Sequence, residues 1–108
     1  MLDQNLKRGL LEVCVLSALV KEESYGYKII RDLSGCVSVS ESTLYPILRR
    51  LESAGQLTER SVEHNGRLRK MYSITAEGKQ QITEFVNGWT ELDAVYRFVK
   101  ESTNDDNG

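Results

Sequence analysis

The chain has 108 residues, of which 40% are hydrophobic and 28% are charged, and its formal net charge is −2. A chain of this length holds one domain and buries a modest core, so a partner subunit is a realistic way to cover more apolar surface. The sequence has one histidine and contains no Gly-x-x-x-x-Gly-Lys, Cys-x-x-Cys or Gly-x-Ser-x-Gly motif. These features argue against an enzyme, a metal site and a cofactor site.

The cysteines and the histidine do not suggest chemistry either. Cys14 lies in the most apolar part of the chain, where a thiol stays protonated, so we interpret it as a core residue and not as a nucleophile activated by His64. Cys14 and Cys36 are too few for a disulfide framework. The longest apolar stretch, residues 10–20, is about half of a membrane span, and the first residues show no signal-peptide pattern. We therefore expect a cytoplasmic protein.

Positive charge is concentrated in the middle of the chain. Residues 1–40 carry five basic and five acidic side chains, residues 41–74 carry six and four, and residues 75–108 carry three and seven. A basic segment before an acidic end is typical of a small DNA-binding module followed by an assembly element. Ordinary scatter of surface charge also gives such numbers, so charge alone does not decide the function.

A first helix is predicted from Asn5, a residue type favoured at the N-cap, to about Lys21 or Glu22. Nine of the eleven residues from 10 to 20 are apolar. A helix that is apolar on nearly every side must be covered on nearly every side. The domain's own core can cover one flank, and a second subunit is the simplest cover for the other.

A second, shorter helix is predicted from Ser24 to Leu33. Ser24 is an N-cap candidate, because serine side chains accept hydrogen bonds from the first free backbone N–H groups of a helix. Gly35 fits the left-handed position that follows a helix C-terminus.

The third predicted helix has an apolar stripe at helical spacing and a polar opposite face. The stripe consists of Leu44, Ile47, Leu48 and Leu51. Ser38, with Glu41 at capping-box spacing, and also Ser40 and Ser42 are rival caps. Pro46 lacks an N–H group, and this favours a start near Ser42.

A β-hairpin follows, with strands predicted at residues 56–63 and 68–74. The His-Asn-Gly-Arg segment between them contains the Asn-Gly turn signal. Because side chains alternate along a strand, Tyr72 and Ile74 share one face of the returning strand and Arg69 points the other way.

The last helix is predicted to begin after Thr75, its N-cap, and to end near Glu101. Large apolar side chains repeat along it with spacings of 3, 4, 3, 4 and 3, namely Ile82, Phe85, Trp89, Leu92, Tyr96 and Val99. This pattern predicts a helix that packs on another helix. We expect it to pair across a twofold axis with a second subunit, and packing on the chain's own first helix is the alternative.

These elements predict a mostly α fold with a small β-hairpin wing. Residues 1–75 are expected to form a winged helix-turn-helix domain and residues 76–101 a dimerisation helix. Residues 102–108 have nothing to bury and are expected to be a disordered tail.

The predicted fold implies a way to bind double-stranded DNA. In a winged helix-turn-helix the third helix enters the major groove, and the wing reaches the flanking backbone. The side chains predicted to bind phosphates are Arg49 of the third helix and Arg67, Arg69 and Lys70 of the wing. Ser42 and Thr43, at the start of the third helix, are predicted to contact base edges.

Three segments share the residue pattern of a known family. They are Tyr25–Ile29, Ser42–Glu52 with Gly55, and Gly66–Thr75 with Gly78 and then Trp89 downstream. The combination of Thr-Leu-Tyr-Pro on a helix with Gly-Arg-x-Arg-Lys-x-Tyr on a wing is specific. On these residues the chain resembles the PadR family of winged-helix transcriptional regulators, over about residues 6–100. Its single C-terminal helix is similar to that of the family's small subgroup.

The resemblance implies a homodimer that binds an inverted-repeat operator, usually as a repressor. It implies DNA contact by Tyr45 and its polar neighbours, with Tyr25 as a further candidate. Glu41, an anion at the entrance to the third helix, departs from what phosphate binding favours. In members that sense drugs, the resemblance implies an aromatic effector between the subunits, stacked on Trp89 with Asp93 one turn on. Packing alone is the other explanation for this tryptophan.

Two other functions stay open on the sequence. A winged helix can serve only as a protein–protein adaptor, and a net charge of −2 is compatible with that role. A small-molecule binder at the subunit interface is the second. Retention on duplex DNA at low salt, falling as salt rises, distinguishes a DNA-binding regulator from the adaptor.

Overall fold

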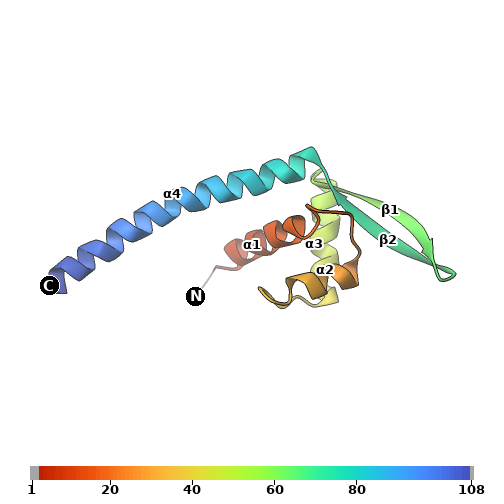
Figure 1. Ribbon diagram of the computed structural model, residues 1–108, viewed down its shortest axis with the longest axis horizontal. Coiled ribbons are helices and arrows are strands. Elements are labelled where there is room, and N and C mark those ends of the chain that lie inside the picture. Colours follow the sequence, from red (N-terminus) through yellow and green to blue (C-terminus); the bar gives the residue numbers. More distant parts are fainter. Residues whose placement is uncertain (1–2, 108) are drawn as a thin grey trace.

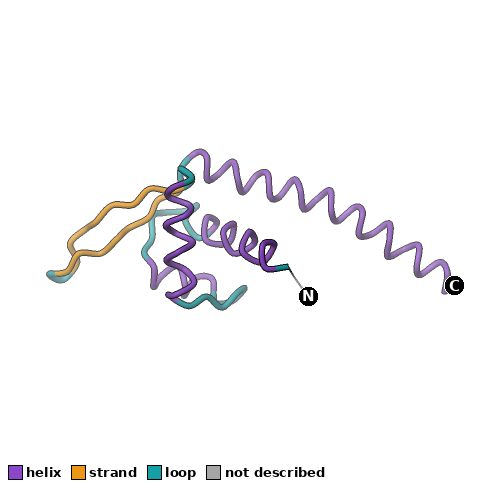
Figure 2. The backbone as a smooth tube through the Cα atoms, turned by 180° about the vertical axis from the view of Figure 1, so that it is seen from behind, coloured by secondary structure: helices purple, strands orange, loops and turns teal. Residues whose placement is uncertain are grey.

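The computed structural model describes residues 3–107, which form four helices and one antiparallel hairpin (Figure 1). In chain order the elements are α1 (Gln4–Ser17), α2 (Gly26–Leu33), α3 (Glu41–Ser53), β1 (Leu57–His64), β2 (Arg67–Ile74) and α4 (Ala76–Asn107). The hairpin and α4 leave the α1–α3 body in opposite directions (Figures 1 and 2), and the molecule measures 67 × 26 × 23 Å. The predicted fold class, mostly α with a hairpin wing, is confirmed.

The core lies where α1, α2, α3 and the inner end of the hairpin meet. Its buried side chains are Val15, Leu16, Leu19, Ile29, Leu33, Val39, Leu44, Ile47, Leu48, Leu51, Leu57 and Tyr72. All four members of the predicted α3 stripe are among them. Burying one such aliphatic side chain stabilises the fold by about 1.5–3 kcal/mol. Burial also raises the pKa of the Tyr72 phenol to about 12.

Helix α1 begins and ends earlier than predicted. Its N-cap is Asp3, whose carboxylate accepts a hydrogen bond from the Asn5 N–H at 3.2 Å, so Asn5 lies inside the helix. After Ser17 the chain tightens, since the Leu19 N–H donates to the carbonyl of Leu16, three residues back. The end predicted near Lys21 or Glu22 is therefore wrong. Apolar residues continue past the helix because Leu19 still fills the core.

The turns around α2 also differ from the prediction. Tyr25 is the N-cap position, and Ser24 instead pairs with Tyr72 of β2 in an antiparallel bridge. Gly35 does not adopt the left-handed conformation predicted for it. Within the described residues, positive φ values occur at Gly55, Asn65 and Gly66.

Helix α3 starts at Glu41 and is capped by Ser40, whose Oγ accepts from the Thr43 N–H at 3.3 Å. The start predicted near Ser42 differs from the observed one by a single residue, and Pro46 lies inside the helix. The proline costs the hydrogen bond to the carbonyl of Ser42. Ser42 is exposed, so water can satisfy that carbonyl and the helix tolerates the proline.

The hairpin is confirmed, with a two-residue turn. Leu57 pairs with Ile74 at its root and His64 with Arg67 at its tip. Asn65 and Gly66 form the turn with φ values of 52° and 78°, as a type I′ turn requires. Along both strands burial is concentrated at the root, so the outer half of the wing extends into solvent.

Helix α4 begins where predicted but ends later. The Thr75 Oγ accepts from the Gly78 N–H at 3.1 Å and donates to the carbonyl of Gly55 at 2.7 Å. A side chain at Gly78 would collide with the carbonyl of Gln56, so glycine lets this helix pack on the wing root. None of the helices in the described chain is long and apolar enough to cross a membrane.

The disordered tail expected from residue 102 is corrected, because α4 continues through Asn107. Extending an existing helix costs far less than starting one. The hydroxyls of Ser102 and Thr103 stay within the helix by donating to the carbonyls of Val99 and Lys100. Residue 108 lies outside the described residues.

Candidate nucleic-acid interface

One face of the molecule is hollowed between the wing and the N-terminal ends of α2 and α3. The hollow has a volume of about 620 Å³. It brings together five of the residues predicted to bind DNA, which are Tyr25, Tyr45, Arg67, Arg69 and Lys70. These residues come from segments that are far apart in the sequence, and the fold alone places them on one surface.

Arg69 is held in place within this hollow. Its guanidinium carbon lies 4.0 Å from the centroid of the Tyr25 ring. A cation over an aromatic face is stabilised by about 0.5–1 kcal/mol at exposed sites. The contact leaves the edge N–H groups of the guanidinium free to donate, so Arg69 is oriented without being neutralised.

The other two wing cations are accessible. Arg67 is exposed at the wing tip and makes no ion pair within residues 3–107. Lys70 is exposed and lies 3.8 Å from a carboxylate oxygen of Glu59 across the hairpin, at the outer limit of an ion pair. A surface pair of this length holds the lysine weakly, so its ammonium group can move to a phosphate.

Tyr45 of α3 is exposed, and its ring lies against the start of α2. A Cβ atom built on Gly26 would lie 2.6 Å from the Tyr45 Oη, so the ring rests where residue 26 has no side chain. This contact brings the first turn of α2 and the outer face of α3 to the same side of the hollow. Glu41, which departs from the basic pattern, lines the hollow as well.

Comparisons with known proteins agree with this geometry. The model of the transcriptional regulator PadR-like family matches residues 15–84. The chain belongs to that family. It is thus a transcriptional regulator and not an enzyme. Among curated relatives of this PadR-like chain, the transcriptional regulator Rv3488 of Mycobacterium tuberculosis is 32% identical over 90 residues, covering 82% of this chain and 84% of that protein.

Solved structures of PadR-like proteins share most of this architecture. A PadR-like transcription factor from Bacteroides fragilis is 34% identical with a TM-score of 0.80, covering 88% of this chain and 94% of that one. Bacillus subtilis PadR, solved in complex with operator DNA, is 29% identical with a TM-score of 0.66. That match covers 71% of this chain but 46% of the longer Bacillus protein.

The remaining predicted DNA contacts of this PadR-like chain lie outside the wing hollow. Ser42 and Thr43 are exposed at the start of α3 and hydrogen-bond with the capping Ser40. Thr43 lines a second hollow of about 460 Å³ between α3 and α1. Arg49 is exposed on α3. The structure therefore joins the wing residues to Tyr45 and spreads the α3 residues along a wider surface.

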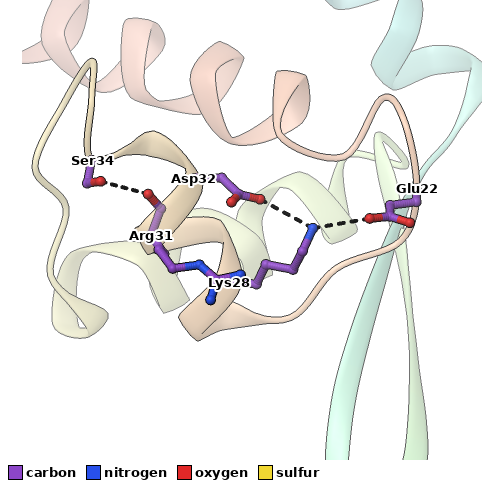
Figure 3. A network of polar contacts seen from close by, with 5 residues as sticks. All are labelled: Glu22, Lys28, Arg31, Asp32 and Ser34. Carbon is purple, nitrogen blue, oxygen red and sulfur yellow. Dashed lines mark hydrogen bonds and ion pairs between the residues drawn. The ribbon is translucent and has the colours of Figure 1, made fainter.

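Lys28 of α2 is not available to phosphates in the same way. Figure 3 shows its ammonium group between the carboxylates of Glu22 and Asp32, at 3.2 and 3.3 Å. These hydrogen bonds, first that to Glu22 and then that to Asp32, raise the pKa of Lys28. Ser34 ends the same helix by donating to the carbonyl of Arg31. Lys28 is thus neutralised within its own network.

The helix stripe predicted at the dimer interface divides into two parts. Ile82 packs against the chain's own core and Phe85 is half-buried, so packing on the first helix accounts for the start of α4. Farther along, Trp89, Leu92, Tyr96 and Val99 are 53%, 55%, 58% and 54% exposed. In the single chain more than half of each of these side chains is therefore left exposed.

The residues predicted for an effector are one helical turn apart on α4. The ring of Trp89 stacks on that of Phe85, with centroids 6.1 Å apart. The carboxylate of Asp93 accepts a hydrogen bond from Arg97 Nε at 2.9 Å. The exposed outer face of the indole is available to a flat partner, which can be a ligand or a side chain.

The sequence interpretation missed several residues of this surface. Tyr27, His64 and Leu68 line the wing hollow, and Lys7 and Arg8 of α1 line the second hollow beside Thr43. The sequence contained a signal for Lys7 and Arg8, because these two adjacent cations lie near the start of a helix whose later residues are mostly apolar. Within residues 3–107 no group of three or more His, Cys, Asp or Glu side chains is arranged to hold a metal ion.

The two cysteines are free thiols. Cys14 is half-buried, and burial together with the neighbouring Cys36 raises its pKa. The thiol is therefore protonated at neutral pH and a poor nucleophile. This agrees with its interpretation as a packing residue.

Proposed function

We propose that two copies of this PadR-like chain bind an inverted-repeat DNA operator as a repressor in the cytoplasm. The observation that carries the proposal is the wing hollow, where Arg67, Arg69 and Lys70 share one surface with Tyr25 and Tyr45. Arg49, Ser42 and Thr43 extend that surface along α3. The operator complex of Bacillus subtilis PadR supports DNA as the partner.

The proposed dimer uses the free part of α4. Its exposed stripe of four large apolar side chains is too apolar to be left in water. A groove of about 450 Å³, lined mostly by apolar side chains, runs between α1 and α4, and its lining residues Phe85 and Val86 lie on α4 one turn before the stripe. A second copy of α4 lying along this continuous surface would cover both, and the twofold axis would set the distance between two α3 helices.

The experiment that tests DNA binding measures the retention of a labelled duplex as a function of salt. Each phosphate neutralised releases condensed counterion, so three wing cations on each of two subunits predict a slope of about −5 in log affinity against log salt. A mobility shift with the wild-type protein at low salt should show retention that falls steeply as salt rises. No retention at any salt would support the protein–protein adaptor instead.

Relief of repression by a flat aromatic effector is a further part of the proposal. It rests on the exposed indole of Trp89, with Asp93 one turn away. Between two subunits, paired indoles would stack on a planar ligand and change the spacing of the α3 helices. Titration with planar aromatic cations should quench the fluorescence of Trp89, the single tryptophan, and weaken duplex retention in parallel. Absence of quenching with all of them would assign Trp89 to packing.

A further inference from the structure

The direction of the wing is determined at its root. The buried residues of β1 and β2 are Leu57 and Tyr72 at the root, and the backbone of the tip lies apart from the other elements in Figures 1 and 2. A hairpin held only at one end can swing, and a two-stranded ribbon by itself is marginally stable. The position of Arg67, Arg69 and Lys70 relative to α3 therefore depends on the contacts that hold the root in place.

Three consecutive residues just before α2, Glu23 to Tyr25, contact the hairpin. Ser24 exchanges two backbone hydrogen bonds with Tyr72 of β2, at 2.7 and 3.0 Å. Tyr25 lies under the Arg69 guanidinium. Glu23 reaches past β2 to the outer strand, where its carboxylate accepts from Arg60 Nε at 2.9 Å and pairs with a second guanidinium nitrogen.

The Glu23–Arg60 pair is the contact that spans the width of the sheet. Arg60 of β1 pairs with Met71 of β2, the neighbour of Tyr72, so the ion pair and the Ser24 bridge hold both strands at the same level. Two parallel N–H···O bonds between an arginine and a carboxylate fix orientation as well as distance. Hydrogen bonding to Arg60 accordingly holds the pKa of the Glu23 carboxyl below its usual value.

We propose that Glu23 is a positioning residue for DNA recognition, because its bidentate pair with Arg60 fixes the angle of the wing relative to α2 and α3. Arg60 then serves the wing root and not a phosphate. This inference rests on the proposed function. The expected direction of the change in DNA affinity distinguishes this role from a simple charge effect. Removing an acidic charge near a DNA-binding face should tighten binding if electrostatics alone acts. Loss of a positioning contact should weaken it.

The test compares Glu23→Gln with Glu22→Gln, which removes the same charge from the adjacent residue but breaks only the pair with Lys28. The probes are a duplex that the wild-type protein selects from a random-sequence pool and a duplex of unrelated sequence. Exposed ion pairs contribute modestly, so Glu23→Gln should bind the selected duplex about three- to five-fold more weakly. Its affinity for the unrelated duplex should not fall, its salt slope and its unfolding midpoint should stay at wild-type values, and Glu22→Gln should lose no affinity for either duplex.

The charge-reversed double variant Glu23→Arg/Arg60→Glu restores the pair at the same net charge and should regain most of the lost affinity. Wild-type or tighter binding of the selected duplex by Glu23→Gln would overturn the positioning role alone, as would an equal loss in Glu22→Gln. Failure of the wild-type protein to retain any duplex would overturn the proposed function and this role with it. The two failures are therefore distinguishable.

Discussion

Leu92→Asp is expected to convert the proposed dimer into a monomer whose winged-helix body stays folded. Leu92 is 55% exposed in the single chain and contacts none of the core around Leu16 and Leu48, so the substitution costs little there. In a dimer the same carboxylate would be buried without a partner, at a cost of several kcal/mol. Subunit affinity should fall by at least a hundredfold.

Sedimentation should show a single protomer for Leu92→Asp, with helical circular dichroism retained. The affinity for the operator should fall by more than the affinity between subunits, because two half-sites would no longer be bound by linked subunits. Ala94→Asp adds the same charge on the opposite side of α4 and is the matched control, expected to remain dimeric. An intact Leu92→Asp dimer would remove α4 from the assembly.

Local signals in the sequence predicted most of the fold. The Asn-Gly pair fixed the hairpin because a two-residue turn needs positive φ at both positions, and Thr75 marked the start of α4 because its hydroxyl serves its own first turn. Both effects act over a few residues. They survive in the folded protein because tertiary packing does not oppose them.

Errors arose where the deciding contact lies elsewhere in the fold. Ser24 looked like a helix cap, yet its backbone pairs with Tyr72, and that partner is invisible to local pattern. The end of α1 was predicted too late, because the apolar residues that follow it fill the core without being helical. Helix starts and ends were thus less predictable than the elements themselves.

The candidate site was predicted as a set of residue types but not as a surface. The wing pattern identified Arg69, and no sequence rule placed its guanidinium over Tyr25. The Glu23–Arg60 pair joins residues 37 positions apart and depends on how the hairpin folds back. Thr43, predicted to contact base edges, borders the hollow next to α1, apart from the wing residues. Such placements follow from packing and not from spacing.

The double variant Arg69→Ala/Lys70→Ala tests the surface that carries the proposed function. It removes two cations from each subunit, so the salt slope should become shallower by about 3.5 and affinity near physiological salt should fall by about a hundredfold or more. The fold should be unaffected, because Lys70 is exposed and Arg69 stacks on Tyr25 outside the buried core. Part of the loss should come from Tyr25, which no longer has a guanidinium to hold its ring.

Arg97→Ala/Lys100→Ala is the charge-matched control, since it removes as many cations from α4, away from the wing hollow. Mobility shifts at several salt concentrations separate the two explanations for any loss. If net charge alone governs binding, both double variants weaken retention equally. If the wing surface binds phosphates, only Arg69→Ala/Lys70→Ala changes the slope. An unchanged slope in that variant would exclude the wing as the phosphate-binding element and leave α3 to bind DNA by itself.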